Sequence, residues 1–310
     1  MKDQCTVWCP ASVSNLNVGF DALGFCLSDA YDIMVFKRVS QPGVHLGELT
    51  GYPTPSVPEN NIACAAAASL LEKHGDPSIG IEISIDKRIK PGSGIGSSAA
   101  SAVGAVTGVQ ALLETTFSEA QLLESALDGE QIASGARHAD NIAPALFGKF
   151  CLIVSQDDHR VVHLDTDLDL YYVVAHQHIE IKTSDSRNSL PQEIPLKTAV
   201  SQWSSLAGFT AGLLTNNLDL MTHCAVDYVA EPVRRSSIPH FDALKEVALR
   251  HGAFTFGISG SGPSVFALCE GSQKAKEVAD QFNVFLSKNQ AQEFKIYSGQ
   301  IHQQGAHEIL

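Results

Sequence analysis

Apolar side chains recur with the period of a helix in some segments of the chain and with the period of a strand in others. Between residues 99 and 113 they return every three or four positions, which predicts one apolar face of a helix. From 79 to 85 every second residue is isoleucine, which predicts a strand. The same criteria predict helices at 62–74, 118–133, 197–218, 240–251 and 273–288, and strands at 31–39, 150–154, 171–176, 253–258 and 263–269.

Two helix boundaries are specified by individual residues. Gly75 follows the alanine-rich 62–74 segment and is expected to close that helix. Ser118 and Gln121, three residues apart, form a capping box that is expected to open the 118–133 helix. Strands and helices alternate without repeats or low-complexity linkers, which indicates a mixed protein of both element types.

The length and net charge of the chain indicate a globular protein of about two domains that does not bind nucleic acid or anionic membranes. At 310 residues the chain is long enough for about two domains, and its 44% hydrophobic content is typical of globular proteins. We place the boundary in the polar segment near 155–165 and predict an N-terminal domain of residues 1–158 and a C-terminal domain of residues 159–310. The net charge of −13 disfavours nucleic acid and anionic membranes as partners, so neither is expected.

The cysteines indicate a reducing compartment. All seven are scattered, their number is odd, and no C-x-x-C pair is present, which favours free thiols. The N-terminal segment has no apolar region of the signal-peptide kind. The longest uninterrupted hydrophobic stretch, residues 62–68, is far too short to span a membrane. We therefore expect a cytoplasmic location.

The most specific signal is the segment at residues 90–101, which reads K-P-G-S-G-I-G-S-S-A-A-S. Its three glycines alternate with other residues, so the backbone can take positive φ and approach a ligand closely. Ser97 and Ser98 follow where the helix would start, and we expect their hydroxyls to be free. A glycine loop that leads into a helix N-terminus forms an anion site, most often for phosphate. A tight turn that caps a buried helix is the alternative that this segment alone leaves open.

The loop matches neither of the two better-known phosphate loops. A Walker A loop ends in G-K-[ST], and no lysine lies between residues 92 and 101. A Rossmann fingerprint is spaced G-x-G-x-x-G, whereas the spacing here is G-x-G-x-G.

Three other segments accompany this loop. They read P-A-S-V-S-N-L-N-V-G-F-D-A-L-G at 10–24, G-E-Q-I-A-S-G-A-R-H-A-D-N-I-A-P-A at 129–145 and G-I-S-G-S-G-P-S at 257–264. In this order the four segments resemble the GHMP kinases, and within that family the homoserine kinases, over nearly the whole chain. The resemblance implies an α+β, two-domain GHMP kinase fold. Its N-terminal domain would be like ribosomal protein S5 domain 2, and its C-terminal domain would be ferredoxin-like.

The resemblance also implies how ATP and Mg²⁺ bind. Glu130 lies on one stripe with Leu123 and Leu127, where a carboxylate needs a partner or a cation. A glutamate that reaches solvent from the edge of the stripe is the alternative, but the resemblance makes Glu130 a Mg²⁺ ligand together with Ser98. The implied ATP-binding residues are those of the loop: Pro91, Gly92, Ser93, Gly94, Ile95, Gly96, Ser97, Ser98, Ala99, Ala100 and Ser101.

The implied catalytic residues, besides Glu130, are Asn141 and Thr183. Many GHMP kinases carry an aspartate base where this chain has Asn141, and asparagine cannot usefully accept a proton. Asp140 is adjacent, but we expect it to point elsewhere, so the proton of the acceptor hydroxyl would pass to a phosphate oxygen. Thr183 is the other polar residue implied near the transferring phosphate; by itself it would be an ordinary exposed threonine.

Homoserine is a zwitterion, so its site needs cations for the carboxylate and an anion for the ammonium. Arg187 and Arg234 are the implied carboxylate ligands, because a guanidinium group can donate two parallel hydrogen bonds. We prefer Arg234 to its neighbour Arg235. The remaining implied substrate residues are Asp21 and Asn15 for the ammonium and the hydroxyl, His138, and Gly260 in the glycine turn that closes over the acceptor.

The implied activity is Mg²⁺-dependent transfer of the γ-phosphoryl group of ATP to the side-chain hydroxyl of L-homoserine, on the route to threonine. Two alternatives stay open. A GHMP kinase for mevalonate or a sugar would have less use for the two arginines and would usually carry aspartate at position 141. A catalytically inactive, ligand-binding regulator is the other, and the retention of Glu130, Ser98 and the whole loop argues against it. A homodimer is a further expectation.

Overall fold

The strands of the computed structural model form two sheets. Residues 1–309 are described except 136, 156–157, 159, 180–182 and 290–292, and the side chains of 133–134 and 183–185 also lie outside the description. The larger sheet has seven strands in the order β11-β1-β2-β4-β3, with β5 paired to β2 and β6 to β5. These strands are β1 (Gln4–Asn15), β2 (Gly19–Val39), β3 (Gly43–Gly51), β4 (Gly80–Lys87), β5 (Phe150–Ile153), β6 (Val161–Leu164) and β11 (His307–Ile309).

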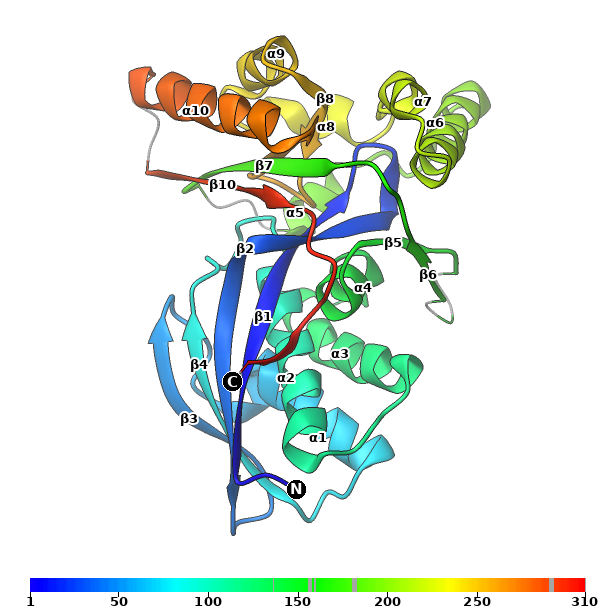
Figure 1. Ribbon diagram of the computed structural model, residues 1–310. Helices are drawn as coiled ribbons and strands as arrows, with labels where there is room; N and C mark the ends of the chain where they lie inside the picture. Colours follow the sequence, from blue (N-terminus) through cyan, green and yellow to red (C-terminus); the bar gives the residue numbers. More distant parts are fainter. Residues whose placement is uncertain (136, 156–157, 159, 180–182, 290–292, 310) are drawn as a thin grey trace.

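Helices cover one face of the larger sheet (Figure 1): α1 (Ile62–His74), α2 (Ser97–Leu113), α3 (Glu119–Ser134) and α4 (Ala139–Phe147). Of these, α2 contacts β1 and β2 as well as the other three helices. Nearly all of its residues are buried, although the apolar periodicity predicted only one buried face. Enclosure on every side fixes the position of α2, and with it the position of the glycine loop that leads into its first turn.

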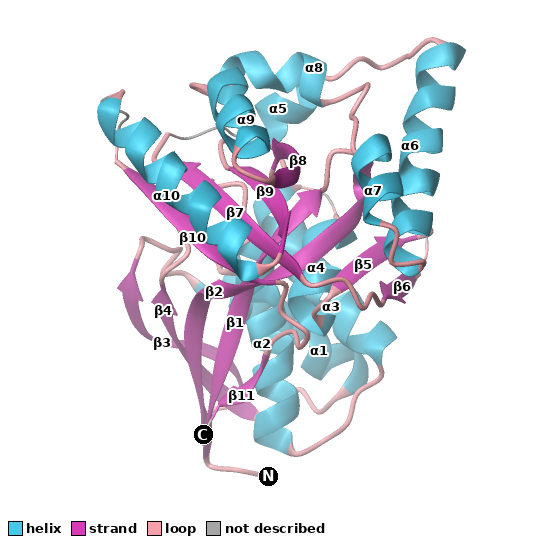
Figure 2. Cartoon of the chain, turned by 45° about the horizontal axis from the view of Figure 1, so that its top comes forward, coloured by secondary structure: helices cyan, strands magenta, loops and turns pink. Residues whose placement is uncertain are grey.

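The smaller sheet is antiparallel, in the order β10-β7-β9-β8. Its strands are β7 (Leu170–Gln177), β8 (Ala253–Ile258), β9 (Val265–Glu270) and β10 (Phe294–Gln300). On one face of this sheet (Figure 2) lie α9 (Phe241–Arg250) and α10 (Ser272–Lys288), whose Phe241 and Phe282 pack against Phe256 of β8. An antiparallel sheet with two helices on one face is the arrangement predicted for the ferredoxin-like half. Shorter elements of this half are α5 (Thr183–Asn188) and α8 (Glu231–Arg234).

Most predicted elements are confirmed, some with different ends. Gly75 is the C-cap of α1, and the capping box of Ser118 and Gln121 opens α3. The helix predicted at 197–218 is α6 (Leu196–Leu214), which ends four residues earlier than predicted, and the separate helix α7 (Leu218–Cys224) was missed. Asn216 adopts positive φ and the side chain of Asn217 caps α7, so the helix cannot continue. The pattern also missed β1, which is buried on both faces and therefore shows no alternation.

Two short strands of the second half of the chain pair with the larger sheet. β6 pairs with β5 and β11 pairs with β1. The division into residues 1–158 and 159–310 stays a prediction, and the strand pairing favours a boundary between Leu164 and Leu170, with the last strand returning to the first domain.

The expected free thiols are confirmed. All seven cysteines lie in the described part of the chain and none is in a disulfide, and six of them are buried. Within the same described residues, no helix combines the length and the apolar character that crossing a lipid bilayer requires.

Candidate active site

A cavity of about 620 Å³ lies where segments from both halves of the chain converge. Its lining includes the glycine loop and the first turn of α2, residues 14–15 and 20–21, and the 260–261 turn. Of the residues predicted for the metal, the acceptor and the substrate, those that line it are Asn15, Asp21, Ser98, Glu130, His138, Asn141, Arg187, Arg234 and Gly260. The side chain of Thr183 lies outside the described residues.

The glycine loop has the backbone conformation that its sequence predicted. Gly92, Gly94 and Gly96 adopt φ angles of 72°, 79° and 66°. At two of these positions a side chain would also collide with the protein: a Cβ on Gly94 would lie 2.6 Å from the carbonyl oxygen of Gly262, and one on Gly96 would lie 2.4 Å from Ser12 Oγ. Gly96 is the N-cap of α2 and has no side chain to cap it. The N–H groups of the first turn are therefore directed toward the cavity end of the helix without a cap from that position.

Not every residue predicted to bind ATP lines the cavity. Ile95, Ala99 and Ala100 are completely buried in the core, so only their backbone could meet a phosphate group. The Ser97 hydroxyl was expected to be free, but it donates a hydrogen bond to the carbonyl oxygen of Ile89 at 3.0 Å. The two serines at the start of the helix therefore differ in role: Ser98 has its hydroxyl beside Glu130 at the cavity, whereas the Ser97 hydroxyl anchors the loop to Ile89.

Ser98 and Glu130 come together as the magnesium prediction requires. Ser98 Oγ donates to Glu130 Oε1 at 3.0 Å, and both residues line the cavity. Burial raises the pKa of Glu130 to about 7, against the opposing effect of the Ser98 hydrogen bond. A carboxylate beside a hydroxyl offers two hard oxygen ligands, which suit Mg²⁺ when phosphates and water supply the rest. No cluster of three or more His, Cys, Asp or Glu side chains suited to a metal occurs among the described residues, so the other ligands would have to come from ATP and water.

A buried ion pair at the start of α2 was missed by the sequence analysis. Lys87 Nζ donates to Asp32 Oδ2 at 2.5 Å, to the Ser97 carbonyl oxygen at 2.6 Å and to Ser101 Oγ at 3.0 Å. All three protons of the ammonium group are therefore used. The other oxygen of Asp32 accepts the N–H groups of Arg88 and Ile89 at 2.7 and 2.8 Å. This pair ties β2, β4 and the first turn of α2 together at the wall of the cavity.

The 15–21 segment holds its polar residues in a strained backbone. Asn15, Leu16, Asn17 and Asp21 adopt φ angles of 74°, 42°, 61° and 56°, which is uncommon outside glycine. The Asn15 amide stabilises this conformation, because Nδ2 donates to the Gly260 carbonyl oxygen at 2.8 Å and Oδ1 accepts the N–H of Asp21 at 3.0 Å. Asn15 thus links the segment to the second glycine turn. Strain of this kind is concentrated at ligand-binding sites.

The two predicted arginines share one aromatic ring. The guanidinium carbon of Arg187 lies 5.4 Å from the centre of the Phe20 ring, and that of Arg234 lies 5.3 Å from it. Arg187 Nη2 also donates to both carboxylate oxygens of Asp21 at 2.8 Å. Phe20 therefore gathers two cations and, through Arg187, one anion at the same side of the cavity.

The structure distinguishes Arg234 from its neighbour. Arg234 is 6% exposed and donates to the Gly260 carbonyl oxygen at 3.1 Å. Burial lowers the pKa of Arg234 from its usual range, and the nearby Asp21 opposes this effect. The Arg235 side chain is 52% exposed and forms an ion pair with Asp242 at 3.5 Å. Among these two residues, Arg234 alone lines the cavity.

The Asn141 amide is fixed at both ends. Its Nδ2 donates to Ser14 Oγ at 2.8 Å, and its Oδ1 accepts from Ser12 Oγ at 2.9 Å. These partners belong to β1, so the strand orients a side chain of the first turn of α4. An amide held in this way can position a substrate hydroxyl without moving.

The prediction that Asp140 points away from the acceptor site is wrong. Asp140 is buried, lines the same cavity as Asn141 and is hydrogen-bonded to Ser14. Burial raises its pKa to about 7, and the negative charge of Asp21 adds to this effect, while Arg187 opposes it. The side-chain directions of Asp140 and Asn141 differ by about 100° around the axis of α4. Both side chains nevertheless reach the cavity, because it lies at the N-terminal end of this helix.

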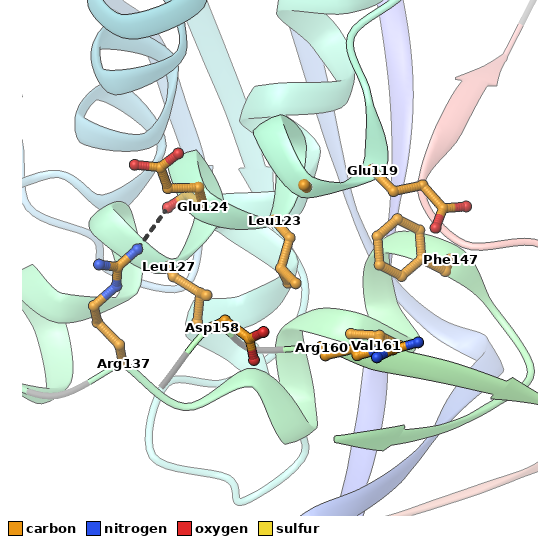
Figure 3. Close-up of a pocket in the computed structure, with 10 residues that line it drawn as sticks. Glu119, Leu123, Glu124, Leu127, Arg137, Phe147, Asp158, Arg160 and Val161 are labelled. Atoms are coloured by element: carbon orange, nitrogen blue, oxygen red, sulfur yellow. Dashed lines mark hydrogen bonds between the residues drawn. The ribbon is translucent and has the colours of Figure 1, made fainter. Parts of the chain in front are cut away.

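A second cavity, of about 590 Å³, is lined by residues from the first two to three turns of α3. Figure 3 shows Leu123 and Leu127 of this helix facing Asp158 and Arg160. Arg137 at its edge donates to the Glu124 carbonyl oxygen at 3.4 Å. None of the residues predicted for catalysis or binding lines this second cavity, so the candidate active site is the first one.

The helix start without a side-chain cap, the paired Ser98 and Glu130, and the two arginines thus line one cavity. The family "GHMP kinases N terminal domain" matches residues 61–149, and "GHMP kinases C terminal" matches residues 206–288. The chain is 36% identical to a homoserine kinase of Chlorobaculum tepidum over 313 residues, which cover 97% of each chain. It is 37% identical to one of Methanococcus vannielii over 283 residues, which cover 90% of this chain and 91% of the relative. The chain therefore belongs to the GHMP kinases, and within that family to the homoserine kinases.

Solved structures agree with this assignment. A crystal structure of homoserine kinase from Cytophaga hutchinsonii matches with a TM-score of 0.95 and 38% identity, covering 100% of this chain and 98% of the other. A crystal structure of L. major mevalonate kinase in complex with R-mevalonate has a TM-score of 0.74 at 17% identity, covering 97% and 98% of the two chains. That second likeness shows the shared fold alone.

Proposed function

We propose that the protein is a cytoplasmic homoserine kinase, which transfers the γ-phosphoryl group of ATP to the side-chain hydroxyl of L-homoserine and forms O-phospho-L-homoserine and ADP. The observation that carries this proposal is the placement of Arg187 and Arg234 against Phe20, in the same cavity as the glycine loop. Two guanidinium groups suit a carboxylate, because charge-assisted hydrogen bonds to it are strong and directional. The product belongs to the route to threonine.

ATP would bind along the glycine-loop wall of the cavity. The N–H groups of the loop and of the first turn of α2 would bind its phosphates. Ser98 and Glu130 would hold Mg²⁺, which when bound neutralises charge on the transferring phosphoryl group. The nucleoside would lie at the end of the cavity lined by Pro53, Thr54, Pro55, Asn60 and Ile62.

Homoserine would lie in the part of the cavity lined by Asp21, Arg187 and Arg234, where each of its polar groups would have a partner. Its carboxylate would meet the two arginines, and its ammonium would meet Asp21, which pairs with Arg187, and Asp140, whose pKa the charge of Arg187 lowers. The fixed amide of Asn141 would orient the hydroxyl, whose proton would pass to a phosphate oxygen. Asn15, His138 and Gly260 would complete the wall, and Thr183 keeps its proposed place near the transferring phosphate.

A coupled assay of ADP release tests the proposal. The acceptors are homoserine, threonine, mevalonate, galactose and shikimate, each with Mg-ATP. Acceptors that lack either the carboxylate or the ammonium leave buried charges uncompensated, so homoserine should have the highest kcat/KM by at least about tenfold, which is about 1.4 kcal/mol of transition-state stabilisation. Equal or greater turnover of mevalonate or galactose would overturn the homoserine assignment. Homoserine binding without ADP release would indicate the inactive regulator.

A further inference from the structure

A buried histidine of the smaller sheet reaches the phosphate loop through one serine. His176 lies on β7 and is 1% exposed. β7 pairs antiparallel with β9, and Ala175 lies opposite Val265. The same register brings His176 opposite Ser264, the residue that precedes β9, and Nδ1 of the ring lies 3.1 Å from Ser264 Oγ. Ser264 Oγ in turn bonds the carbonyl oxygen of Ser93 in the glycine loop.

The hydrogen bonds of Ser264 determine which ring nitrogen carries the proton. The carbonyl oxygen of Ser93 can only accept, so the single hydroxyl proton of Ser264 is used in that bond. The Ser264 oxygen must then accept from His176, which requires a proton on Nδ1. The other nitrogen, Nε2, is buried and has no hydrogen-bond partner among the residues that the structure describes. The opposite tautomer would place two acceptors against each other.

The surroundings keep this ring neutral. Burial lowers the pKa of His176 to about 3, with smaller contributions in the same direction from His178, Lys90 and Lys295. The buried Nε2 costs free energy, because it has left water without gaining a donor. An apolar side chain at this position would avoid that cost. The favourable contribution of the histidine therefore lies in the hydrogen bond that Nδ1 donates.

We propose that His176 is a positioning residue for ATP, which orients the phosphate loop through Ser264. The N–H at Nδ1 holds the hydroxyl oxygen of Ser264, so its proton stays directed at the Ser93 carbonyl, and a hydroxyl that accepts one hydrogen bond donates the next more strongly. The Ser93 carbonyl and the Gly94 N–H belong to one peptide plane, so fixing the first fixes the direction of the second. This role rests on the proposed function, because it takes the loop as the ATP site.

Isothermal titration calorimetry with Mg-ATP tests the role of the Nδ1 donor. His176→Leu removes the donor, whereas His176→Asn, which has nearly the shape of leucine, carries an N–H donor on Cγ as histidine does. We expect Kd for Mg-ATP to rise about 5- to 10-fold in His176→Leu, as loss of one hydrogen bond does, and less than about twofold in His176→Asn. The matched control is His251→Leu, at a partly exposed histidine that pairs with Glu277, and it should be silent.

The outcomes separate this role from the proposed function. If the unmodified protein does not bind Mg-ATP, the proposed function fails and this role fails with it. If it binds Mg-ATP and His176→Leu binds equally tightly, only the role of His176 is overturned. Equal losses in His176→Leu and His176→Asn would indicate that the ring acts by packing, which would also overturn the proposal.

A double variant tests whether His176 acts through Ser264. In Ser264→Ala the hydroxyl is gone, so the further change His176→Leu should leave Kd for Mg-ATP where Ser264→Ala alone puts it. KM for homoserine should change much less than Kd for Mg-ATP in all of these variants, which a general loss of structure would not produce. Losses that add in the double variant would mean that the two residues act independently and would overturn the proposal.

The tautomer can be measured in the unmodified protein, so this test does not depend on how a variant folds. The ¹⁵N chemical shifts of the ring nitrogens distinguish a proton on Nδ1 from one on Nε2, and His176→Asn identifies the signals by their loss. We expect a neutral ring protonated at Nδ1 throughout about pH 5 to 8, where an ordinary histidine titrates. A proton on Nε2 instead, or a ring that becomes charged in this range, would overturn the proposal.

Discussion

Ser264 Oγ donates a hydrogen bond to the carbonyl oxygen of Ser93 at 2.6 Å, and this bond joins the second glycine turn to the phosphate loop. A parallel bond runs from Ser259 Oγ to the Gly94 carbonyl oxygen at 2.7 Å. In a trans peptide the carbonyl and the next N–H point in opposite directions. Two carbonyls held against the turn therefore direct the N–H groups of Gly94 and Ile95 away from it. The second half of the chain thus helps to orient the anion-binding groups of the first.

Removal of the Ser264 hydroxyl should weaken ATP binding. Ser264→Ala leaves the buried Ser93 carbonyl without this donor, which costs about 1–3 kcal/mol and loosens the loop. We expect KM for ATP to rise about 5- to 10-fold, with a much smaller change in KM for homoserine. Steady-state kinetics with each substrate varied in turn measures both values. Ser236→Ala, at an exposed position, is the control and should be silent. A change confined to the homoserine KM would contradict this role.

The arginine substitutions should act on homoserine rather than on ATP. The carboxylate of homoserine does not change during phosphoryl transfer, so its contacts are equal in the ground and transition states and are expressed in KM. Arg187→Ala or Arg234→Ala should raise KM for homoserine about 10- to 100-fold, since a charged hydrogen bond contributes about 1.5–3 kcal/mol. Lysine should rescue each only partly, because it lacks the planar fork. Arg235→Ala is the control; a large homoserine KM effect there instead would contradict the assignment.

Much of this site could be predicted because its residues belong to continuous motifs. The glycine loop, Glu130 and Asn141 lie in short segments whose spacing is fixed by local backbone geometry, and the structure gathers them in one cavity. The apolar pattern likewise predicted α1, and the spacing of Ser118 and Gln121 predicted the capping box of α3, because both features depend on residues close together in the sequence. Contacts between distant segments, such as Phe20 with the two arginines, cannot be derived from local spacing.

The alternation of residues along two strands does indicate the buried ion pair of Lys87 and Asp32. The isoleucines of the 79–85 strand occupy odd positions, and Lys87 continues that phase. On β2, Asp32 shares the even phase of the buried Met34 and Phe36. A charged residue on the buried phase of a strand requires a partner. Asp140 left no such signal, because its burial depends on how α4 meets β1.

Substitution of Lys87 should destabilise the fold strongly. Lys87→Met keeps the length of the side chain but leaves the buried carboxylate of Asp32 without its cation, which typically costs about 3–5 kcal/mol. Urea unfolding of the variant and the unmodified protein measures the difference. The control is Lys73→Met, which breaks the ion pairs of an exposed lysine with Glu124 and Asp128 and should cost no more than about 1 kcal/mol. Equal, small effects of the two variants would show that the buried pair contributes little.

The magnesium assignment can be separated from a structural role of Glu130. Glu130→Gln keeps the shape of the side chain and its contact with Ser98 but removes the charge that would hold Mg²⁺. We expect kcat to fall by a factor of about 10² or more, because charge neutralisation is a main part of phosphoryl-transfer catalysis. The unfolding midpoint should change little. Near-normal activity of the variant at low Mg²⁺ would mean that Glu130 is not a metal ligand.

The pH dependence should reveal two carboxylates with the same pKa and different partners. Glu130 and Asp140 both have a pKa raised to about 7 by burial. Each would act as an anion, so kcat/KM for homoserine should level off about one pH unit above 7 and fall as pH decreases through 7. Excess Mg²⁺ should bind ionised Glu130 and shift its titration to lower pH. The acid limb of the kcat/KM profile, which falls about tenfold per pH unit, would then report the protonation of Asp140 alone.

Asp140→Asn tests that remaining limb. The variant has no charge to offer the homoserine ammonium, so its kcat/KM should be low at every pH, and at high Mg²⁺ it should no longer fall as pH decreases from 8 toward 6. The unmodified protein under the same conditions is the reference, and its KM for ATP should vary little over this range. A limb that persists unchanged in Asp140→Asn would assign the titration to another group and remove Asp140 from the ammonium site.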